Sequence, residues 1–330
     1  MTGDELSRAV LNPPPSPPAL IEEFLYPHCA SMITGETGKG KTVIGANIAA
    51  CLSSGTSLFS MLKVLEPQRV YYLQLEGSLS EQFRRLHFIQ KVIPINFSNL
   101  YWDGDRKKRL MTLDPQSATR KYDQIAKAFS QPPNLLLIDP AYKATGGDLA
   151  KADVALSLVD FSDRVMDGLG CSVLFLHHPH RDKMSLFGKK VEEDDSYYGH
   201  SFLKNHIESS YIFKPLDAEG ERSQLICKKR REENSLPIID LCYHPETYTC
   251  SMLPTISKEG KREALELFLL SCTQKGVATT FKDAQKESGL RTSFLRELQS
   301  TYIEKGLLKV IPTPGKTSIW IPKFNEVSGE

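Results

Sequence analysis

The feature that most constrains this chain is a glycine-rich motif of eight residues near its start. Residues 35–42 read GETGKGKT and satisfy the pattern G-x-x-x-x-G-K-[ST]. The glycines let the backbone wrap so that successive N–H groups point inward, and such a concave row of amides binds phosphate oxygens. The motif needs a strand before it and a helix after it, and SMIT (31–34) and VIGANIAACL (43–52) fit these elements. This context argues against a chance match, so we predict a phosphate-binding loop.

Each part of the motif has a chemical task. The helix that begins here adds the positive end of its dipole, and Lys41 can reach the β- and γ-phosphates of a nucleoside triphosphate. The Thr42 hydroxyl is a ligand for the accompanying Mg²⁺. The motif therefore predicts ATP and Mg²⁺ as ligands, with nucleotide contacts from Gly35, Glu36, Thr37, Gly38, Lys39, Gly40, Lys41, Thr42 and Val43.

Short apolar runs alternate with amphipathic segments along the middle of the chain. Runs of this kind are typical of buried parallel strands, and their alternation with helices predicts an α/β fold. We expect a mainly parallel sheet with helices on both faces. The expected strands are 31–34, 69–76, 134–139 and 171–178, and the expected helices are 41–53, 80–91, 118–129 and 153–168.

The later part of the chain has a different pattern. Residues 180–200 read as a long loop, and short runs separated by turns follow it, which predicts an antiparallel extension of the sheet. After Pro254, three helical patterns and a hairpin turned by PTPGK match the plan of a winged-helix module. The runs of the extension are 209–216, 223–230, 236–243 and 247–253. We expect an extended proline-rich lead (1–18), a P-loop domain (19–254) and a small winged-helix-like domain (255–330).

Composition sets further limits. The 330 residues have a formal net charge of +1, so any basic surface for a nucleic acid must be local. No run approaches the ~20 apolar residues of a membrane span, and the start of the chain lacks the apolar core of a signal peptide. The seven cysteines are scattered and odd in number, as in a protein with reduced thiols. We therefore expect a cytoplasmic protein with no membrane partner.

Two acids are candidates for work on the phosphates. Asp139 closes the run NLLLID, where we expect it beside the P-loop strand, oriented toward the metal. Glu76 closes RVYYLQLE and is placed to accept a proton from an attacking water. The alternatives are a strand-end aspartate that caps a turn with Pro140, and a glutamate that stabilises the start of the next helix.

The order of these motifs is specific. A P-loop, a strand ending in glutamate, a strand ending in Ile-Asp-Pro and a strand ending in HHPHR resemble the RecA-like ATPases of the plasmid RepA hexameric helicase type, which are similar to DnaB-like replicative helicases. The resemblance covers about residues 19–250. It implies that Glu76 is the catalytic base, that Asp139 is the Walker B aspartate, and that His177 and His178 sense the γ-phosphate or couple it to DNA. The family usually has lysine where this chain has Arg181, which keeps the charge and changes its geometry.

The resemblance also implies a catalytic cation from a neighbouring subunit. The family motif K-x-R matches Lys228 and Arg230, while the register of Lys229 and Arg231 is left open. A period of two would put either pair on one face of its strand. A cation aimed at a neighbour's γ-phosphate makes hydrolysis depend on assembly, here a homo-hexamer or another ring. The alternative is a solvated basic run.

Two loops are candidates for nucleic-acid contacts. In RecA-like motors the loops after the Walker B strand and after the next strand face the central channel, and here these are residues 143–152 and 181–196. Basic side chains neutralise phosphates, and Tyr142 and Phe187 offer stacking surfaces. Plain surface lysines are the alternative, and the acidic VEEDD nearby weakens the basic character. The predicted contacts to single-stranded DNA are Lys143, Lys151, Arg181, Lys183, Lys189 and Lys190.

Histidines and cysteines do not predict a zinc site. His177 and His178 are adjacent on a strand and so point to opposite faces, and Cys242, His244 and Cys250 lack the CxxC spacing of a zinc knuckle.

Taken together, the sequence predicts an ATP-driven hexameric motor on single-stranded DNA, used in replication of a plasmid, phage or mobile element, with the C-terminal domain as a docking module for a replication partner. A regulatory or recombination ATPase that does not unwind DNA is the alternative.

Overall fold

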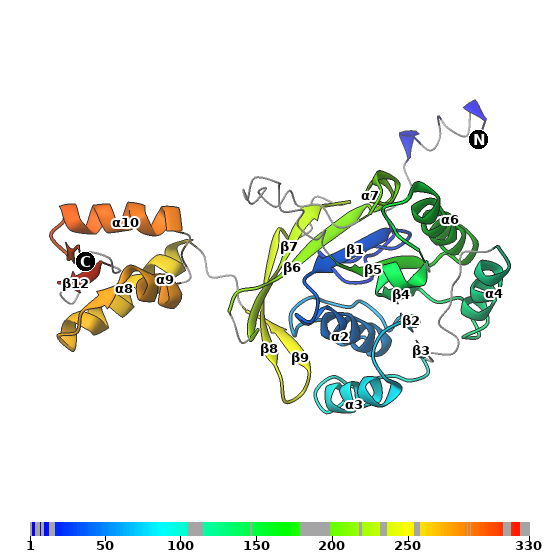
Figure 1. Cartoon of the computed structure of the whole chain (residues 1–330), viewed down its shortest axis with the longest axis horizontal. Helices are drawn as coiled ribbons and strands as arrows, with labels where there is room; N and C mark the ends of the chain where they lie inside the picture. Colours follow the sequence, from blue (N-terminus) through cyan, green and yellow to red (C-terminus); the bar gives the residue numbers. More distant parts are fainter. Residues whose placement is uncertain are drawn as a thin grey trace. The chain divides into compact units, whose positions relative to one another are not determined.

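The chain divides into two compact units, Met1–Leu253 and Pro254–Glu330 (Figure 1). This computed structural model describes residues 2–3, 7, 10–12, 17–104, 115–145, 147–178, 199–217, 220–231, 236–253, 258–288, 290, 292–312 and 318–323. Within these residues, no helix has both the length and the apolar character that crossing a membrane requires.

The first unit is built on one nine-stranded sheet with the order β3-β2-β4-β5-β1-β6-β7-β8-β9. The strands from β3 to β6 are parallel, and those from β6 to β9 are antiparallel. Their bounds are Ala30–Gly35 (β1), Val70–Gln74 (β2), Leu100–Asp103 (β3), Leu135–Asp139 (β4), Ser172–His177 (β5), Ser209–Pro215 (β6), Arg222–Lys229 (β7), Ile238–His244 (β8) and Thr249–Met252 (β9).

Two expectations about this sheet were wrong, and one strand was not predicted. The run 209–216 was expected to be antiparallel, but β6 pairs in parallel with β1, because the long connection after β5 is enough for a crossover. The Walker B strand β4 was expected beside the P-loop strand, but β5 lies between β4 and β1. The edge strand β3 was missed, since four residues give too short a pattern to recognise.

Helices cover both faces of the sheet, because side chains alternate along each strand. Tyr72 joins a core on the face of α2 (Lys41–Ser54) and α3 (Leu79–Ile89), whereas its neighbour Tyr71 joins a core on the opposite face. The opposite face is covered by α4 (Pro115–Ala126) and α6 (Ala152–Leu169) (Figure 1). The described residues of this unit also include two short helices, α5 (Ala141–Ala144) and α7 (Ser201–His206).

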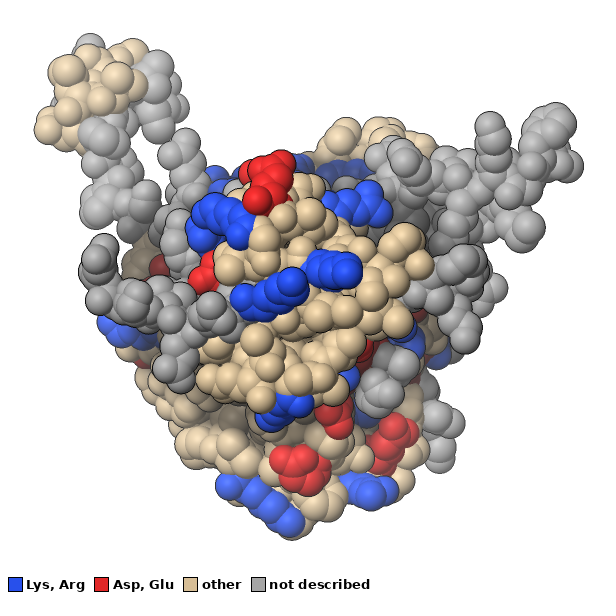
Figure 2. All heavy atoms as spheres, turned by 90° about the vertical axis from the view of Figure 1, so that its left-hand side faces the viewer, with Lys and Arg blue, Asp and Glu red and all other residues tan. Residues whose placement is uncertain are grey.

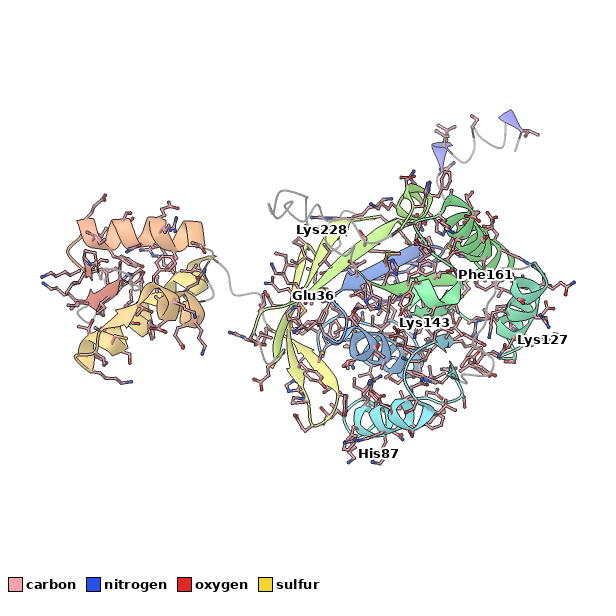
Figure 3. All side chains as sticks on the ribbon, in the orientation of Figure 1. Glu36, His87, Lys127, Lys143, Phe161 and Lys228 are labelled. Carbon is pink, nitrogen blue, oxygen red and sulfur yellow. The ribbon has the colours of Figure 1, made fainter. Side chains whose placement is uncertain are left out.

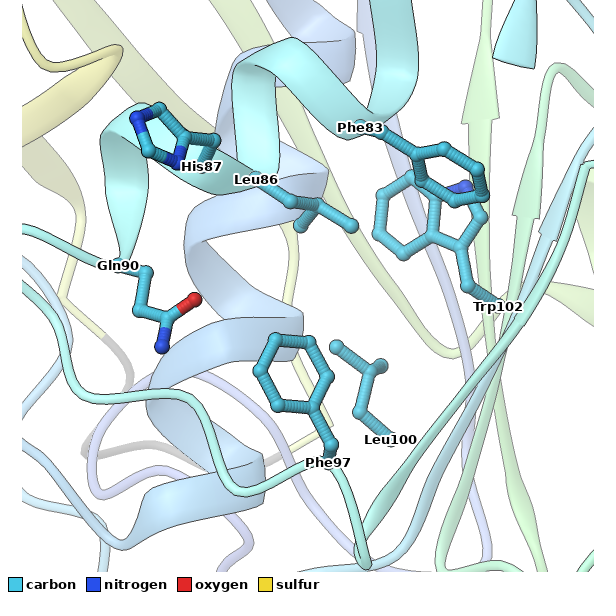
Figure 4. A pocket seen from close by; sticks show the side chains of 7 residues that line it. All are labelled: Phe83, Leu86, His87, Gln90, Phe97, Leu100 and Trp102. Atoms are coloured by element: carbon cyan, nitrogen blue, oxygen red, sulfur yellow. The ribbon is translucent and has the colours of Figure 1, made fainter. Parts of the chain in front are cut away.

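A hollow of about 270 Å³ opens between α3 and the edge strand β3 (Figure 4). Its wall is mainly apolar, with Phe83, Phe97 and Trp102 as the aromatic members, and it includes no residue of the P-loop.

The second unit has its own core. Helices α8 (Lys258–Gln274), α9 (Phe281–Ser288) and α10 (Thr292–Glu304) pack around the buried Trp320 and Tyr302. A small antiparallel sheet has the order β10-β12-β11, with the bounds Thr279–Thr280, Ile319–Pro322 and Leu308–Ile311. The predicted fold class is therefore confirmed, while the winged-helix likeness of this unit stays a prediction.

Candidate active site

The candidate site lies where the parallel strands end. The P-loop follows β1, Asp139 is the last residue of β4, and His177 is the last residue of β5. Because parallel strands end at one edge of a sheet, these groups meet there. The predicted strand 69–76 is shorter than expected: β2 ends at Gln74, and Glu76 lies two residues further, before the cap of α3.

Two glycines have a clear steric role in the P-loop. Gly40 has φ 110°, a left-handed conformation that side chains rarely adopt. A Cβ on Gly35 would lie 2.8 Å from the carbonyl oxygen of Phe213 on β6. The wrapped conformation of the loop therefore depends on glycine at both positions.

Lys41 lies inside this wrapped loop. Its Nζ donates hydrogen bonds to the carbonyl oxygens of Gly35 (2.6 Å) and Glu36 (2.8 Å). Burial lowers the pKa of Lys41 to about 8, although the carboxylates of Asp139, Glu76 and Glu36 act in the opposite direction. An anion beside this ammonium would favour its charged form, so a triphosphate fits the loop electrostatically.

Asp139 is buried at the base of the site. It accepts hydrogen bonds from the Tyr72 hydroxyl (2.8 Å) and from Gln74 Nε2 (3.3 Å), and it also bonds to the Thr42 side chain. Burial raises the pKa of Asp139 more than these hydrogen bonds lower it. A carboxylate and a hydroxyl brought together are the hard oxygen ligands that Mg²⁺ prefers, so this pair fits the ion.

Glu76 is held from one side by α5. Its Oε1 accepts a hydrogen bond from the Tyr142 hydroxyl and forms an ion pair with Lys143 Nζ at 3.0 Å. Burial raises the pKa of Glu76, but Tyr142, Lys143 and His178 outweigh it and leave the pKa below its usual value. A carboxylate that is ionised at neutral pH can accept a proton from water.

His177 and His178 separate as the strand geometry predicts. The side chain of His177 is completely buried, whereas His178 is partly exposed. The Nδ1 of His178 lies 3.0 Å from the Thr37 hydroxyl in the P-loop, and its ring lies 5.2 Å from that of Tyr142. His178 therefore connects the P-loop to α5.

Four exposed basic residues lie at the end of β7 and just beyond it (Figure 3 labels Lys228). Lys229 donates to the carbonyl oxygens of Ile207 and Asn205, and Arg231 donates to the carbonyl of His28 and pairs with Glu208. The side chain of Arg230 bonds to that of Cys227. Internal contacts therefore do not distinguish the two registers.

The predicted nucleic-acid residues are only partly described. Lys143, labelled in Figure 3, lies on α5 and pairs with Glu76, and Lys151 is exposed at the start of α6. The other four, Arg181, Lys183, Lys189 and Lys190, lie outside the described residues, as does Phe187.

Sequence reasoning missed the contacts that orient the two acids. The contact of Tyr72 could have been inferred from the sequence, because Tyr72 lies two residues before Gln74 on the same strand and its side chain is on the α2 face. Tyr142 was predicted to stack on bases, but its hydroxyl bonds to Glu76. That contact joins residues 66 positions apart, and no local pattern reveals it.

This edge, with its P-loop, buried aspartate and nearby glutamate, defines a RecA-like P-loop ATPase. A family model described as "AAA domain" matches residues 2–184, which is more than half of the chain. The chain belongs to this AAA domain family.

Solved structures of low sequence identity are similar to this chain. A DnaB-like replicative helicase, described with its interactions with primase, is similar at a TM-score of 0.52 and 13% identity, over 75% of this chain and 66% of that one. A KaiC-like protein of the archaeon Pyrococcus horikoshii matches at a TM-score of 0.49 and 13% identity, over 71% of this chain and 94% of that one. No sequence match was found among curated proteins.

Proposed function

We propose that this ATPase is a cytoplasmic, ring-forming motor that translocates on single-stranded DNA, a hexameric helicase for replication of a plasmid, phage or other mobile element. The observation that carries the proposal is the meeting of Lys41, Asp139 and Glu76 at one sheet edge, with a set of exposed cations elsewhere on the same domain.

The chain's own residues divide the chemistry among them. Lys41 and the P-loop amides would bind the phosphates, and Thr42 and Asp139 would hold Mg²⁺, which would supply charge neutralisation at the phosphates. Glu76 accepts a proton from water as the water oxygen bonds to the γ-phosphorus and the bond to the β–γ bridging oxygen breaks, giving ADP and phosphate.

Lys228 and Arg230 are the proposed cations for a neighbouring subunit. Because β7 runs antiparallel to β6, its last residues lie toward the amino end of β1, whereas the P-loop follows the carboxyl end. Exposed cations there lie at the opposite end of the sheet from their own P-loop, which favours action on another subunit. The register of Lys228 and Arg230 is the one that the family motif K-x-R matches.

Contacts to DNA are proposed for the two loops after β4 and β5. Lys143 and Lys151 belong to the first loop, and the second contains Arg181, Lys183, Lys189 and Lys190. Phosphate contacts of this kind would make DNA affinity fall steeply with salt.

Unwinding of a forked DNA with ATP tests the proposal. We expect unwinding by the wild type and none by Lys41→Ala, with Lys127→Ala, an exposed lysine after α4, as the matched control that keeps activity. Hydrolysis should be stimulated by single-stranded DNA and rise steeply with protein concentration, since each site needs a neighbour. A rate per subunit that does not change with concentration or with DNA would contradict the proposal.

One observation supports a second candidate, a regulatory or recombination ATPase. Helix α10 carries Arg296 beside Glu297 and Glu304, which is a weak charge pattern for reading DNA and suits a protein contact better. In the face shown in Figure 2, basic and acidic side chains are interspersed. Hydrolysis without unwinding would favour the regulatory ATPase, and open filaments in electron micrographs would favour the recombination ATPase.

A further inference from the structure

The side chain of Glu76 is restrained by a single short element. Tyr142 and Lys143 are consecutive residues of α5, and both donate to the same atom, Oε1 of Glu76. Helix α5 begins two residues after Asp139, so it starts at the metal-binding aspartate and ends beside the proposed base. One displacement of α5 would therefore change both contacts of Glu76 together.

These contacts weaken Glu76 as a base. An oxygen that already accepts a hydroxyl proton and faces an ammonium has less electron density to offer to water. The two donors also fix the direction of the carboxylate toward α5. As long as both contacts are made, this oxygen bonds to α5 and is not free to accept a proton from water.

The ion pair between Lys143 and Glu76 is open to exchange. The side chain of Lys143 is 40% exposed and that of Glu76 is 34% exposed, so solvent reaches both partners. An ion pair this exposed is weak, and a phosphate group that reaches Lys143 can compete with the carboxylate.

The same helix is also connected to the P-loop, through His178. The ring of Tyr142 lies 5.2 Å from that of His178, and His178 in turn contacts the hydroxyl of Thr37 at 3.0 Å. A side chain of the P-loop is thus connected to the proposed base through His178 and Tyr142. The cluster of Thr37, His178, Tyr142, Lys143 and Glu76 links the nucleotide to the loop that carries Lys143.

We propose that Tyr142 and Lys143 are positioning residues that hold Glu76 in a restrained state, and that a DNA phosphate which draws Lys143 away releases Glu76 for catalysis. This rests on the proposed function. Lys143 then acts first on the carboxylate and second on DNA, which makes it the point where DNA binding is coupled to hydrolysis.

Rates of ATP hydrolysis without DNA test this directly. Lys143→Met should raise the DNA-free kcat severalfold, toward the DNA-stimulated level of the wild type, with little change in KM for ATP. Further DNA should stimulate this variant little, and Lys143→Arg should restore the low DNA-free rate. Lys127→Met is the control, because it removes an exposed lysine that lies just after α4 and outside the proposed site and DNA loops; its DNA-free kcat should equal that of the wild type.

Tyr142→Phe gives a second readout with a minimal change of shape. It removes the hydroxyl contact and should raise the DNA-free kcat in the same direction by a smaller factor. A DNA-free kcat that is unchanged or lower in both variants would overturn the inference, since Lys143 would then be only a DNA contact or would position Glu76 productively. A wild type that does not hydrolyse ATP at all would instead overturn the proposed function.

Discussion

The two acids of the site have opposite environments. Asp139 is buried among a tyrosine, a glutamine and a threonine, and burial raises its pKa, whereas the donors around Glu76 lower the pKa of that residue. A metal ligand gains from a fixed, buried position, which Asp139 has. Glu76 is ionised at neutral pH, as a proton acceptor must be, while Tyr142 and Lys143 restrain it.

The depressed pKa of Glu76 predicts the acid side of the pH profile. A base must be deprotonated to act, so the wild-type rate should fall only when the pH drops below the usual range of a glutamate. Removing Lys143 takes away a cation that stabilises the carboxylate, so the pKa rises and the fall in rate should begin at higher pH. Profiles of DNA-free kcat for the wild type and Lys143→Met measure the shift; a shift toward lower pH would contradict the assignment.

Tyr72→Phe should lower stability through one hydrogen bond. The variant keeps the ring that stacks on Trp102 at 4.0 Å but removes the donor to the buried Asp139. Loss of a partner to a buried acceptor costs about 1–3 kcal/mol in free energy of unfolding, measurable by urea denaturation. Tyr101→Phe, on the exposed edge strand, is the control and should change stability by less than about 0.5 kcal/mol.

At the scale of elements, individual helices and strands were predictable, but the order and pairing of the strands in the sheet were not. The helix after the P-loop and the strands at 134–139 and 171–178 follow from local apolar pattern, because each is long and uniform. The insertion of β5 between β1 and β4, and the parallel pairing of β6, depend on crossover connections that no local pattern encodes. Helix α5, which holds Glu76, is too short for a period to be recognised.

Gly45→Ala tests how closely α2 packs on the sheet. A Cβ at this position would lie 2.7 Å from Leu176 Cδ1 and 2.8 Å from the Tyr72 hydroxyl oxygen. Alanine favours helix by about 1 kcal/mol over glycine, but overpacking costs about 1–3 kcal/mol, so we expect a net loss of stability. In the comparison variant Gly168→Ala on α6, the added Cβ would meet the hydroxyl and ring carbons of Tyr122. Tyr122 is partly exposed and can move toward solvent, so thermal unfolding should show a smaller loss. Equal losses would contradict this description of α2.

At the scale of the molecule, each of the two compact units has a core of its own. The sequence predicted the change after Pro254 because the spacing of turns and the type of helix pattern alter there. It could not predict the cluster around Glu76, since Tyr142 reaches that residue only after the strands have been ordered in the sheet.

Separate expression of residues 1–253 should therefore give a folded domain. The nine-stranded sheet and all of the site residues lie within it, so ATP binding should match that of the whole chain. Circular dichroism and titration with ATP check this. If the shortened protein were unfolded, the second unit would have to contribute to the core of the first.

The central claim is tested most directly by the rate of ATP hydrolysis of Glu76→Gln at saturating ATP, beside the wild type and the control variant Glu66→Gln, at an exposed residue outside the site. The amide keeps the shape of the side chain and cannot accept the proton, so we predict normal ATP binding with kcat lowered by about 10²–10⁴-fold, and near wild-type kcat for Glu66→Gln. Hydrolysis by Glu76→Gln at the wild-type rate would contradict the account.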